Sequence, residues 1–148
     1  MTPDADPIEI LLAEDNPGDV KLTEKAFEQG QVLNNFNVVN DGEEALQYLR
    51  QEGEYADAEP VDLLLLDLNM PRKSGDEVLK EMTDDPQLQR VPTVVLTSSS
   101  AEADIAKSYD HNANAYLTKP VDFDGLLDVV DRIEGFWLSV VRYPPERR

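Results

Sequence analysis

Short apolar runs alternate with longer segments of mixed polarity along the chain, and this alternation predicts the secondary structure. Five runs are typical of β-strands, at residues 8–13, 36–39, 61–66, 91–96 and 113–117. The third run is continuously apolar from Leu63 to Leu66, which is typical of a strand buried on both faces of a sheet. The pattern therefore predicts a parallel sheet with central, fully covered strands.

The mixed segments carry helix start signals, in which a short polar side chain caps the first turn. Capping boxes begin at Ser74 and Ser99, each with a glutamate three residues later. Asn16 and Asp41 are predicted N-caps of two further helices. Strand and helix units in succession predict a flavodoxin-like, doubly wound α/β fold, with a five-stranded parallel sheet of order 2-1-3-4-5 and five helices.

The chain length suits a single domain. Its 148 residues, 41% of them hydrophobic, are enough for one core. We expect one domain over residues 8–141, flexible termini at 1–7 and 142–148, and no output domain. No apolar run approaches the roughly 20 residues of a membrane span, and the start of the chain does not resemble a secretory signal. A cytoplasmic protein is therefore expected.

The composition is strongly acidic, with 31 acidic and 13 basic side chains and a formal net charge of −18. Such a charge repels nucleic acids and anionic lipids, so we expect neither as a partner. The absence of cysteine excludes disulfides, thiol catalysis and cysteine metal sites. There are 17 aspartates, 14 glutamates and only six lysines. This balance indicates a cytoplasm rich in salt, as in halophilic microbes, where self-repulsion is screened.

Reactive side chains directly follow several of the predicted strands. Glu14 and Asp15 follow the first strand, Asp67 the third, Thr97 the fourth and Lys119 the fifth. Because ligands of such sheets bind at the carboxyl ends of the strands, we expect these side chains to meet at one edge. Clustered carboxylates favour a hard cation such as Mg²⁺, whose coordination a phosphate oxygen can complete.

This cluster predicts phosphoryl chemistry centred on Asp67. Its carboxylate ends the central strand and is the natural nucleophile, so attack on phosphorus would give an acyl phosphate. Mg²⁺ and Lys119 would neutralise the charge on the phosphoryl oxygens. Thr97 and the backbone N–H of Ser98 would donate hydrogen bonds to the same oxygens.

The strand-end residues together resemble the receiver domain of two-component response regulators. The segment from Asp67 to Pro71, followed by Gly75, resembles the phosphorylation loop of that family, and Lys119-Pro120 completes the set. The resemblance covers roughly residues 8 to 130. It implies that a sensor histidine kinase donates the phosphoryl group to Asp67 and that signalling proceeds through protein contacts.

The resemblance implies further roles for individual residues. The Mg²⁺ ligands would be Asp15, Asp67, the backbone carbonyl of Asn69 and, through water, Glu14. Tyr116 would change rotamer with Thr97 on phosphorylation, and the peptide bond before Pro120 would be cis. The protein would not be an enzyme toward other substrates, because it would catalyse only its own phosphorylation and slow autodephosphorylation.

The sequences of residues 97–100 and 115–122 resemble, within this family, those of small stand-alone receivers that serve phytochrome-type sensor kinases. Phe136 and Trp137 extend the apolar arc of the last helix beyond the usual end of a minimal receiver. We therefore expect a homodimer contact that involves the fourth helix, the fifth strand and the fifth helix, together with these two aromatic residues.

Three alternatives stay open at this level. A receiver could serve as a phosphoryl shuttle or sink in a phosphorelay. A phosphatase of the haloacid dehalogenase type also uses a strand-end aspartate with Mg²⁺, but that family has a second aspartate where this chain has Asn69. A flavodoxin-like flavin carrier shares the topology, but three carboxylates would repel the phosphate of the flavin.

Overall fold

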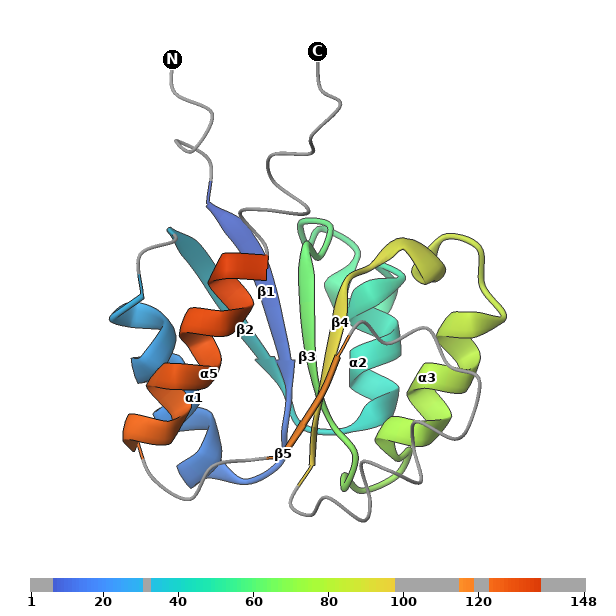
Figure 1. Ribbon diagram of the computed structural model, residues 1–148. Helices are drawn as coiled ribbons and strands as arrows, with labels where there is room; N and C mark the ends of the chain where they lie inside the picture. The colour runs from blue at the N-terminus through green and yellow to red at the C-terminus, as the bar shows by residue number, and fades with distance from the viewer. Residues whose placement is uncertain (1–6, 31–32, 98–114, 119–122, 137–148) are drawn as a thin grey trace, which may run out of the picture.

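The structure is a computed structural model that describes residues 7–30, 33–97, 115–118 and 123–136 (Figure 1). Five parallel strands form one sheet of order β2-β1-β3-β4-β5, which confirms the predicted topology. The strands are β1 (Ile8–Ala13), β2 (Asn34–Val39), β3 (Leu63–Asp67), β4 (Thr93–Thr97) and β5 (Ala115–Thr118).

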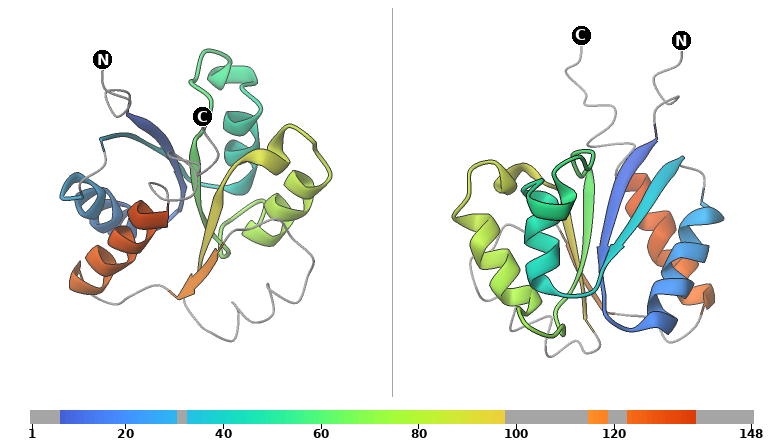
Figure 2. Two further views of the ribbon diagram at one scale, coloured as in Figure 1. Left: turned by 45° about the horizontal axis from the view of Figure 1, so that its top comes forward. Right: turned by 180° about the vertical axis from the view of Figure 1, so that it is seen from behind.

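Helices cover both faces of the sheet (Figures 1 and 2). Helices α1 (Pro17–Glu28) and α5 (Phe123–Phe136) lie on one face, and α2 (Gly42–Leu49) and α3 (Gly75–Thr83) lie on the other. The helix predicted after Ser99 lies outside the described residues, so four of the five predicted helices are described. No helix in the described part of the chain has both the length and the apolarity needed to cross a membrane.

The predicted helix caps are present at the starts of α1, α2 and α3. In each case the side chain of the cap residue accepts a hydrogen bond from a backbone N–H three residues later, and the three caps are Asn16, Asp41 and Ser74. The capping box is complete at Ser74, because Glu77 accepts from the backbone N–H of Ser74 in return. Each cap satisfies a donor that the first helical turn leaves unpaired, which stabilises a helix by about 1 kcal/mol.

Strand β3 is the centre of the core. Leu63 to Leu66 are each at most 1% exposed, as the continuous apolar run predicts. Leu64 and Leu66 pack in the layer with α2 and α3, whereas Leu63 and Leu65 pack in the layer with α1 and α5. From α5 that second layer receives the first four residues of the predicted apolar arc, Leu126, Val129, Val130 and Ile133. The site is therefore carried by a sheet that is covered on both faces.

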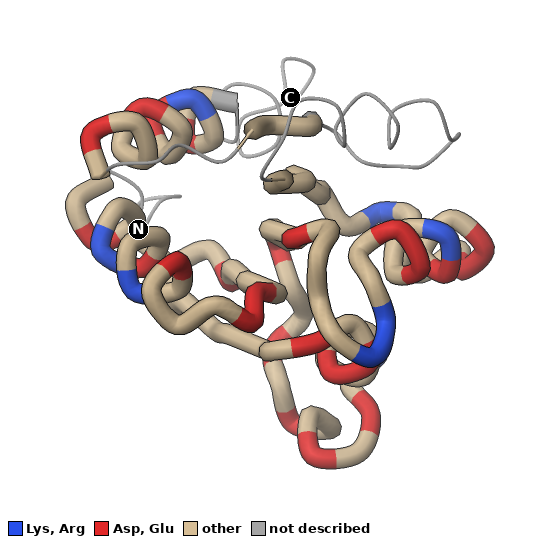
Figure 3. The backbone as a smooth tube through the Cα atoms, turned by 90° about the horizontal axis from the view of Figure 1, so that it is seen from below, with Lys and Arg blue, Asp and Glu red and all other residues tan. Residues whose placement is uncertain are grey.

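The strand register brings the carboxyl ends of the central strands to one level. Ala13 of β1 pairs with Leu66 of β3, and Asp67 pairs with Leu96 of β4. The residues that follow β1, end β3 and end β4 consequently share one edge of the sheet. Figure 3 views the molecule from the side of this edge, with acidic positions in red and basic positions in blue along the described backbone.

Candidate functional site

Three carboxylates gather at the carboxyl edge of the sheet, as the sequence predicts. One oxygen from each of Glu14, Asp15 and Asp67 lies within 4.8 Å of the other two. Glu14 and Asp67 are only 2% and 3% exposed, whereas Asp15 is exposed. Three negative charges this close repel one another, and a hard divalent cation that prefers oxygen ligands would offset the repulsion. The donor set therefore fits such a cation. We call these three residues the acidic cluster.

The start of α1 fixes the position of Glu14. The backbone N–H of Glu14 donates to the carbonyl of Val39 at 3.0 Å, which continues the pairing of β1 with β2. Its carboxylate accepts from the backbone N–H of Asn16 at 3.2 Å, and Asn16 in turn caps α1. Strand end and helix start together hold this buried acid at the edge of the sheet.

Asp67 begins a tight loop that leads into α3. Its carboxylate accepts from the backbone N–H of Asn69 at 3.3 Å. The N–H of Gly75 donates to the carbonyl of Leu68 at 3.0 Å and closes the loop. A Cβ atom at Gly75 would lie 2.6 Å from the carbonyl oxygen of Asp67, so only glycine allows α3 to start this close to Asp67.

Thr97 and Tyr116 occupy the neighbouring strands. Thr97 ends β4 and is fully buried, and Tyr116 lies on β5 opposite Val95. Tyr116 is half-buried against the layer of α2 and α3. Burial raises the pKa of its phenol above the ordinary value of 10.0, and the negative charge of Asp76 raises it further. The hydroxyl group therefore stays protonated near neutral pH and can donate a hydrogen bond.

Comparison with known families agrees with this geometry. The response regulator receiver domain matches residues 10–131, which is most of the chain. The chain belongs to the response regulator receiver family. This membership leaves the phosphatase and flavin-carrier alternatives without support.

This receiver is similar to Rcp1 and to RcpA along nearly the whole of their length. Response regulator Rcp1 of Synechocystis sp. is 41% identical over 135 residues, which cover 91% of this chain and 92% of Rcp1. The crystal structure of the phosphorylated cyanobacterial phytochrome response regulator RcpA is 48% identical with a TM-score of 0.83, covering 92% of this chain and 97% of RcpA. The structure of the Mn²⁺-bound form of Rcp1 is 41% identical with a TM-score of 0.80, covering 91% and 97%.

Several residues predicted for the receiver site lie outside the described part of the chain. They are Ser98, Lys119, Pro120 and Trp137, and the cis bond predicted before Pro120 belongs with them. The side chain of Phe136 is likewise not described. Their roles stay predictions. The structure does bring together the acidic cluster, Asn69 and Thr97, and it places Tyr116 two strands from Asp67.

Two contacts of the loop that carries Asp67 have no counterpart among the contacts that the sequence predicts. Asp41 was predicted only as a helix cap, but it also forms an ion pair with Arg72 of this loop. Gly42, which follows Asp41, packs directly against the backbone of Lys73. A glycine next to a cap residue was a weak signal for such a close approach, and no sequence pattern indicated the ion pair.

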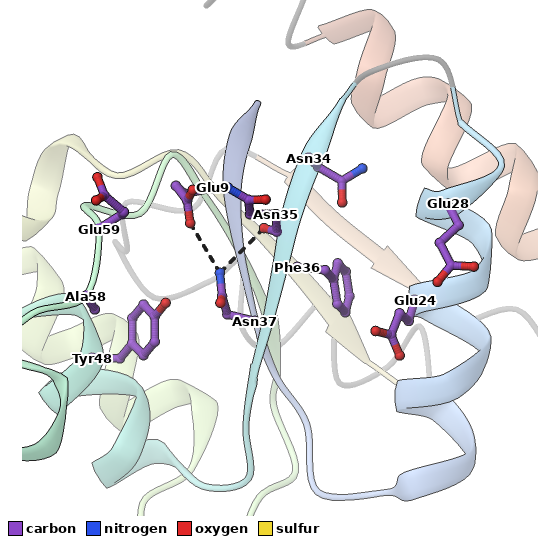
Figure 4. A pocket seen from close by; sticks show the side chains of 10 residues that line it. All are labelled: Glu9, Glu24, Glu28, Asn34, Asn35, Phe36, Asn37, Tyr48, Ala58 and Glu59. Carbon is purple, nitrogen blue, oxygen red and sulfur yellow. Dashed lines mark hydrogen bonds between the residues drawn. The ribbon is translucent and has the colours of Figure 1, made fainter. Parts of the chain in front are cut away.

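A hollow of about 590 Å³ lies along the edge strand β2 (Figure 4). Its lining is rich in carboxylates, which are those of Glu9, Glu24, Glu28 and Glu59. Asn37 donates a hydrogen bond to Glu9 at 3.4 Å within it. The hollow involves the first residues of β1 and β2, so it lies at the opposite end of these strands from the acidic cluster. Its negative charge would repel a phosphate group, and it is not the predicted site.

Proposed function

We propose that this receiver accepts a phosphoryl group on Asp67 from a partner histidine kinase and passes the signal on through protein contacts. The observation that carries the proposal is the acidic cluster, in which the buried Asp67 carboxylate ends the central strand beside two other acids. The fold presents Asp67 at the edge where ligands of such sheets bind. Membership of the receiver family supports the same chemistry.

The residues of the site would divide the work of phosphoryl transfer. A carboxylate oxygen of Asp67 attacks the phosphorus of a phosphohistidine, so that an O–P bond forms while the N–P bond breaks and the imidazole leaves with the partner. Asp15, Asp67 and the carbonyl of Asn69 would hold a divalent cation, and Glu14 would reach the cation through water. When bound, the cation supplies positive charge to the transferring oxygens. Thr97 would donate to one of these oxygens and Lys119 would pair with another.

We take Mg²⁺ as the physiological cation and a phytochrome-type kinase as the donor. Mg²⁺ suits a site with few carboxylates, because it keeps several waters and accepts phosphate oxygens. The Mn²⁺-bound form of Rcp1 supports a divalent metal, and the phytochrome response regulator RcpA supports the class of partner. The protein would act on itself alone, through its own phosphorylation and slow autodephosphorylation.

Phosphorylation would be read out at the surface next to β5. Thr97 and Tyr116 would rearrange together and bias a surface made of the fourth helix, β5 and α5 between two states. The same surface, with Phe136 and Trp137, would form a homodimer. A role as shuttle or sink in a phosphorelay is the second candidate, and it requires the phosphoryl group to move on from Asp67 to another histidine.

The dimer has a direct test in solution. Replacing the aromatic side chain by a charge, Trp137→Glu, should lower the molar mass measured by light scattering from that of two chains to that of one. A molar mass that is the same for the variant and the wild type would remove this part of the proposal.

Transfer from a kinase tests the function as a whole. A phosphorylated phytochrome-type histidine kinase, freed of nucleotide, is mixed with the receiver and Mg²⁺, and the label on each protein is followed with time. We expect label to pass to the wild type and to Asp57→Asn, which loses a carboxylate of an exposed loop at the far end of the sheet, but not to Asp67→Asn. Equal transfer to Asp67→Asn would contradict the proposal.

A further inference from the structure

The turn between β2 and α2, residues 40–42, contacts both loops that carry the acidic cluster, although it contributes no acid to the cluster. The side chain of Asn40 donates to the backbone carbonyl of Glu14 at 3.3 Å. Asp41 pairs with Arg72 in the loop that follows Asp67. The turn therefore connects the loop after β1 with the loop after β3.

Asp41 uses both of its carboxylate oxygens, and its side chain is only 4% exposed. Oδ1 accepts from the backbone N–H of Glu44 at 2.8 Å and caps α2. Oδ2 accepts a hydrogen bond from Nε of Arg72 at 3.0 Å, and in the ion pair it lies 2.9 Å from Nη2. The Arg72 side chain is 65% exposed, so water screens the pair in part, but it still joins the loop to the start of α2.

Arg72 stands in a strained backbone conformation. Its φ is 67°, a value that favours glycine, and the N–H of Lys73 donates to the carbonyl of Pro71 at 2.7 Å. A positive φ at the centre of such a three-residue turn is the rare, strained form of the γ-turn. Strain of this kind persists only where surrounding contacts impose it, and it concentrates at functional sites.

The backbone at the start of α2 also packs against the γ-turn at Arg72. A Cβ atom at Gly42 would lie 2.1 Å from the carbonyl oxygen of Lys73, so the first turn of α2 rests directly on this segment. The strained turn is thus held by an ion pair on one side and by close backbone packing on the other. It lies three residues after Asn69, whose carbonyl is a predicted metal ligand.

We propose that Arg72 is a positioning residue for the metal and phosphoryl site, acting through Asp41 to hold the loop from Asn69 to Ser74 in its ligating conformation. This inference rests on the proposed function, since it assumes that the acidic cluster binds a divalent cation. Without the Arg72 side chain the γ-turn relaxes. The carbonyl of Asn69 then moves away from the position in which it could bind the same cation as Asp15 and Asp67.

The sign of the effect separates positioning from simple electrostatics. Removing a positive charge near three carboxylates should, by Coulomb attraction alone, tighten the binding of a cation. Positioning predicts the opposite, because a misplaced ligand costs affinity. Arg90→Ala is the matched control, since it removes the same charge from an exposed position just before β4, at the far end of the sheet.

The probe is Mn²⁺, titrated into the full chain while free Mn²⁺ is measured by electron paramagnetic resonance. We expect Arg72→Ala to bind about fivefold more weakly than Arg90→Ala. Arg72→Lys, which keeps a cation for Asp41, should recover part of the affinity. Circular dichroism and thermal melting identify the temperature range in which every variant is folded. Equal or tighter binding by Arg72→Ala would overturn the inference.

The variant Asp41→Asn provides a second, independent test of the pairing between Asp41 and Arg72. Asparagine caps helices as well as aspartate does, so α2 is retained while the ion pair is lost. In this background Arg72→Ala should cause no further loss of Mn²⁺ affinity, and a full fivefold loss would overturn the pairing. If the wild type bound no Mn²⁺, the proposed function would be overturned as well. If the wild type bound Mn²⁺ and Arg72→Ala bound it with the same affinity, only this inference would be overturned.

Discussion

Glycine at position 75 is a requirement of the loop that carries Asp67. Its backbone N–H closes the loop on Leu68, and its missing side chain lets α3 begin against the carbonyl of Asp67. Asp67 and the helix after it therefore pack as one unit. A side chain at this position would push the loop away from the end of β3.

Gly75→Ala should consequently destabilise the protein by about 1–3 kcal/mol, the usual cost of overpacking a tight site. Gly135→Ala is the control, because a Cβ atom at Gly135 meets nothing within 4 Å and alanine favours a helix. Urea denaturation of both variants measures the difference. If the two variants were equally stable, the close approach at Gly75 would be wrong.

The acidic cluster could be predicted from the sequence because two simple regularities place it. Parallel strands bring their carboxyl ends to one edge, and Glu14, Asp15 and Asp67 each stand at such an end. The γ-turn at Arg72 could not be predicted in this way. A positive φ at a non-glycine residue is imposed by the fold around it, here by the buried Asp41, and leaves no local pattern.

The predicted strand bounds agree with the structure at β1 and differ by up to two residues at β2, β3 and β4, where for example β3 begins at Leu63 rather than at residue 61. Strand β1 has the predicted bounds, whereas β2 begins two residues before its apolar run, at Asn34. Its first residues pair with Ile8 and Glu9 through backbone hydrogen bonds, which need no apolar side chain in an edge strand. Strand β4 begins two residues later than predicted, after Pro92, which has no N–H to donate to the sheet.

Helices α2 and α3 and the Asp67 loop are also joined by charged side chains. Glu81 of α3 accepts a hydrogen bond from Lys73 of the loop and pairs with Arg50 at the end of α2, at 3.5 Å. The hydrogen bond from Lys73 is the main reason that the pKa of Glu81 lies below its ordinary value of 4.5. The folded protein therefore favours the ionised carboxylate.

The linkage between proton binding and folding determines the pH range in which this network stabilises the folded protein. A lowered pKa in the folded state gives stability that is present above about pH 4.5 and is lost as the pH falls through the folded-state pKa. The wild type should be more stable than Glu81→Gln at pH 7, and the gap should close in acid. Glu24→Gln, which breaks no ion pair of the described residues, is the control. A gap that is constant from pH 7 to pH 3 would contradict the network.

The net charge of −18 is a property of the whole molecule rather than of its site. Removing Glu14, Asp15, Asp67 and Lys119 from the count leaves 28 acidic and 12 basic side chains, a charge of −16. Almost all of the acidity is therefore unrelated to phosphoryl transfer. It repels itself across the folded surface, and this cost depends on the salt concentration.

Salt should therefore stabilise the fold. Between 0.01 M and 1 M potassium chloride the screening length falls from about 30 Å to about 3 Å, which removes most of the repulsion. We expect the melting temperature to rise by about 5 °C, equivalent to roughly 2 kcal/mol for a chain of this size. A melting temperature that is independent of salt, measured by calorimetry, would remove the predicted adaptation to a salt-rich cytoplasm.

The central claim is that one buried carboxylate of this receiver, Asp67, takes the phosphoryl group. The most direct measurement is the intact mass of the full chain after incubation with a small phosphodonor and Mg²⁺. We expect one added phosphoryl group on the wild type and none on Asp67→Asn or after removal of the metal by a chelator. A stable phosphoryl group on Asp67→Asn, or an unlabelled wild type, would contradict it.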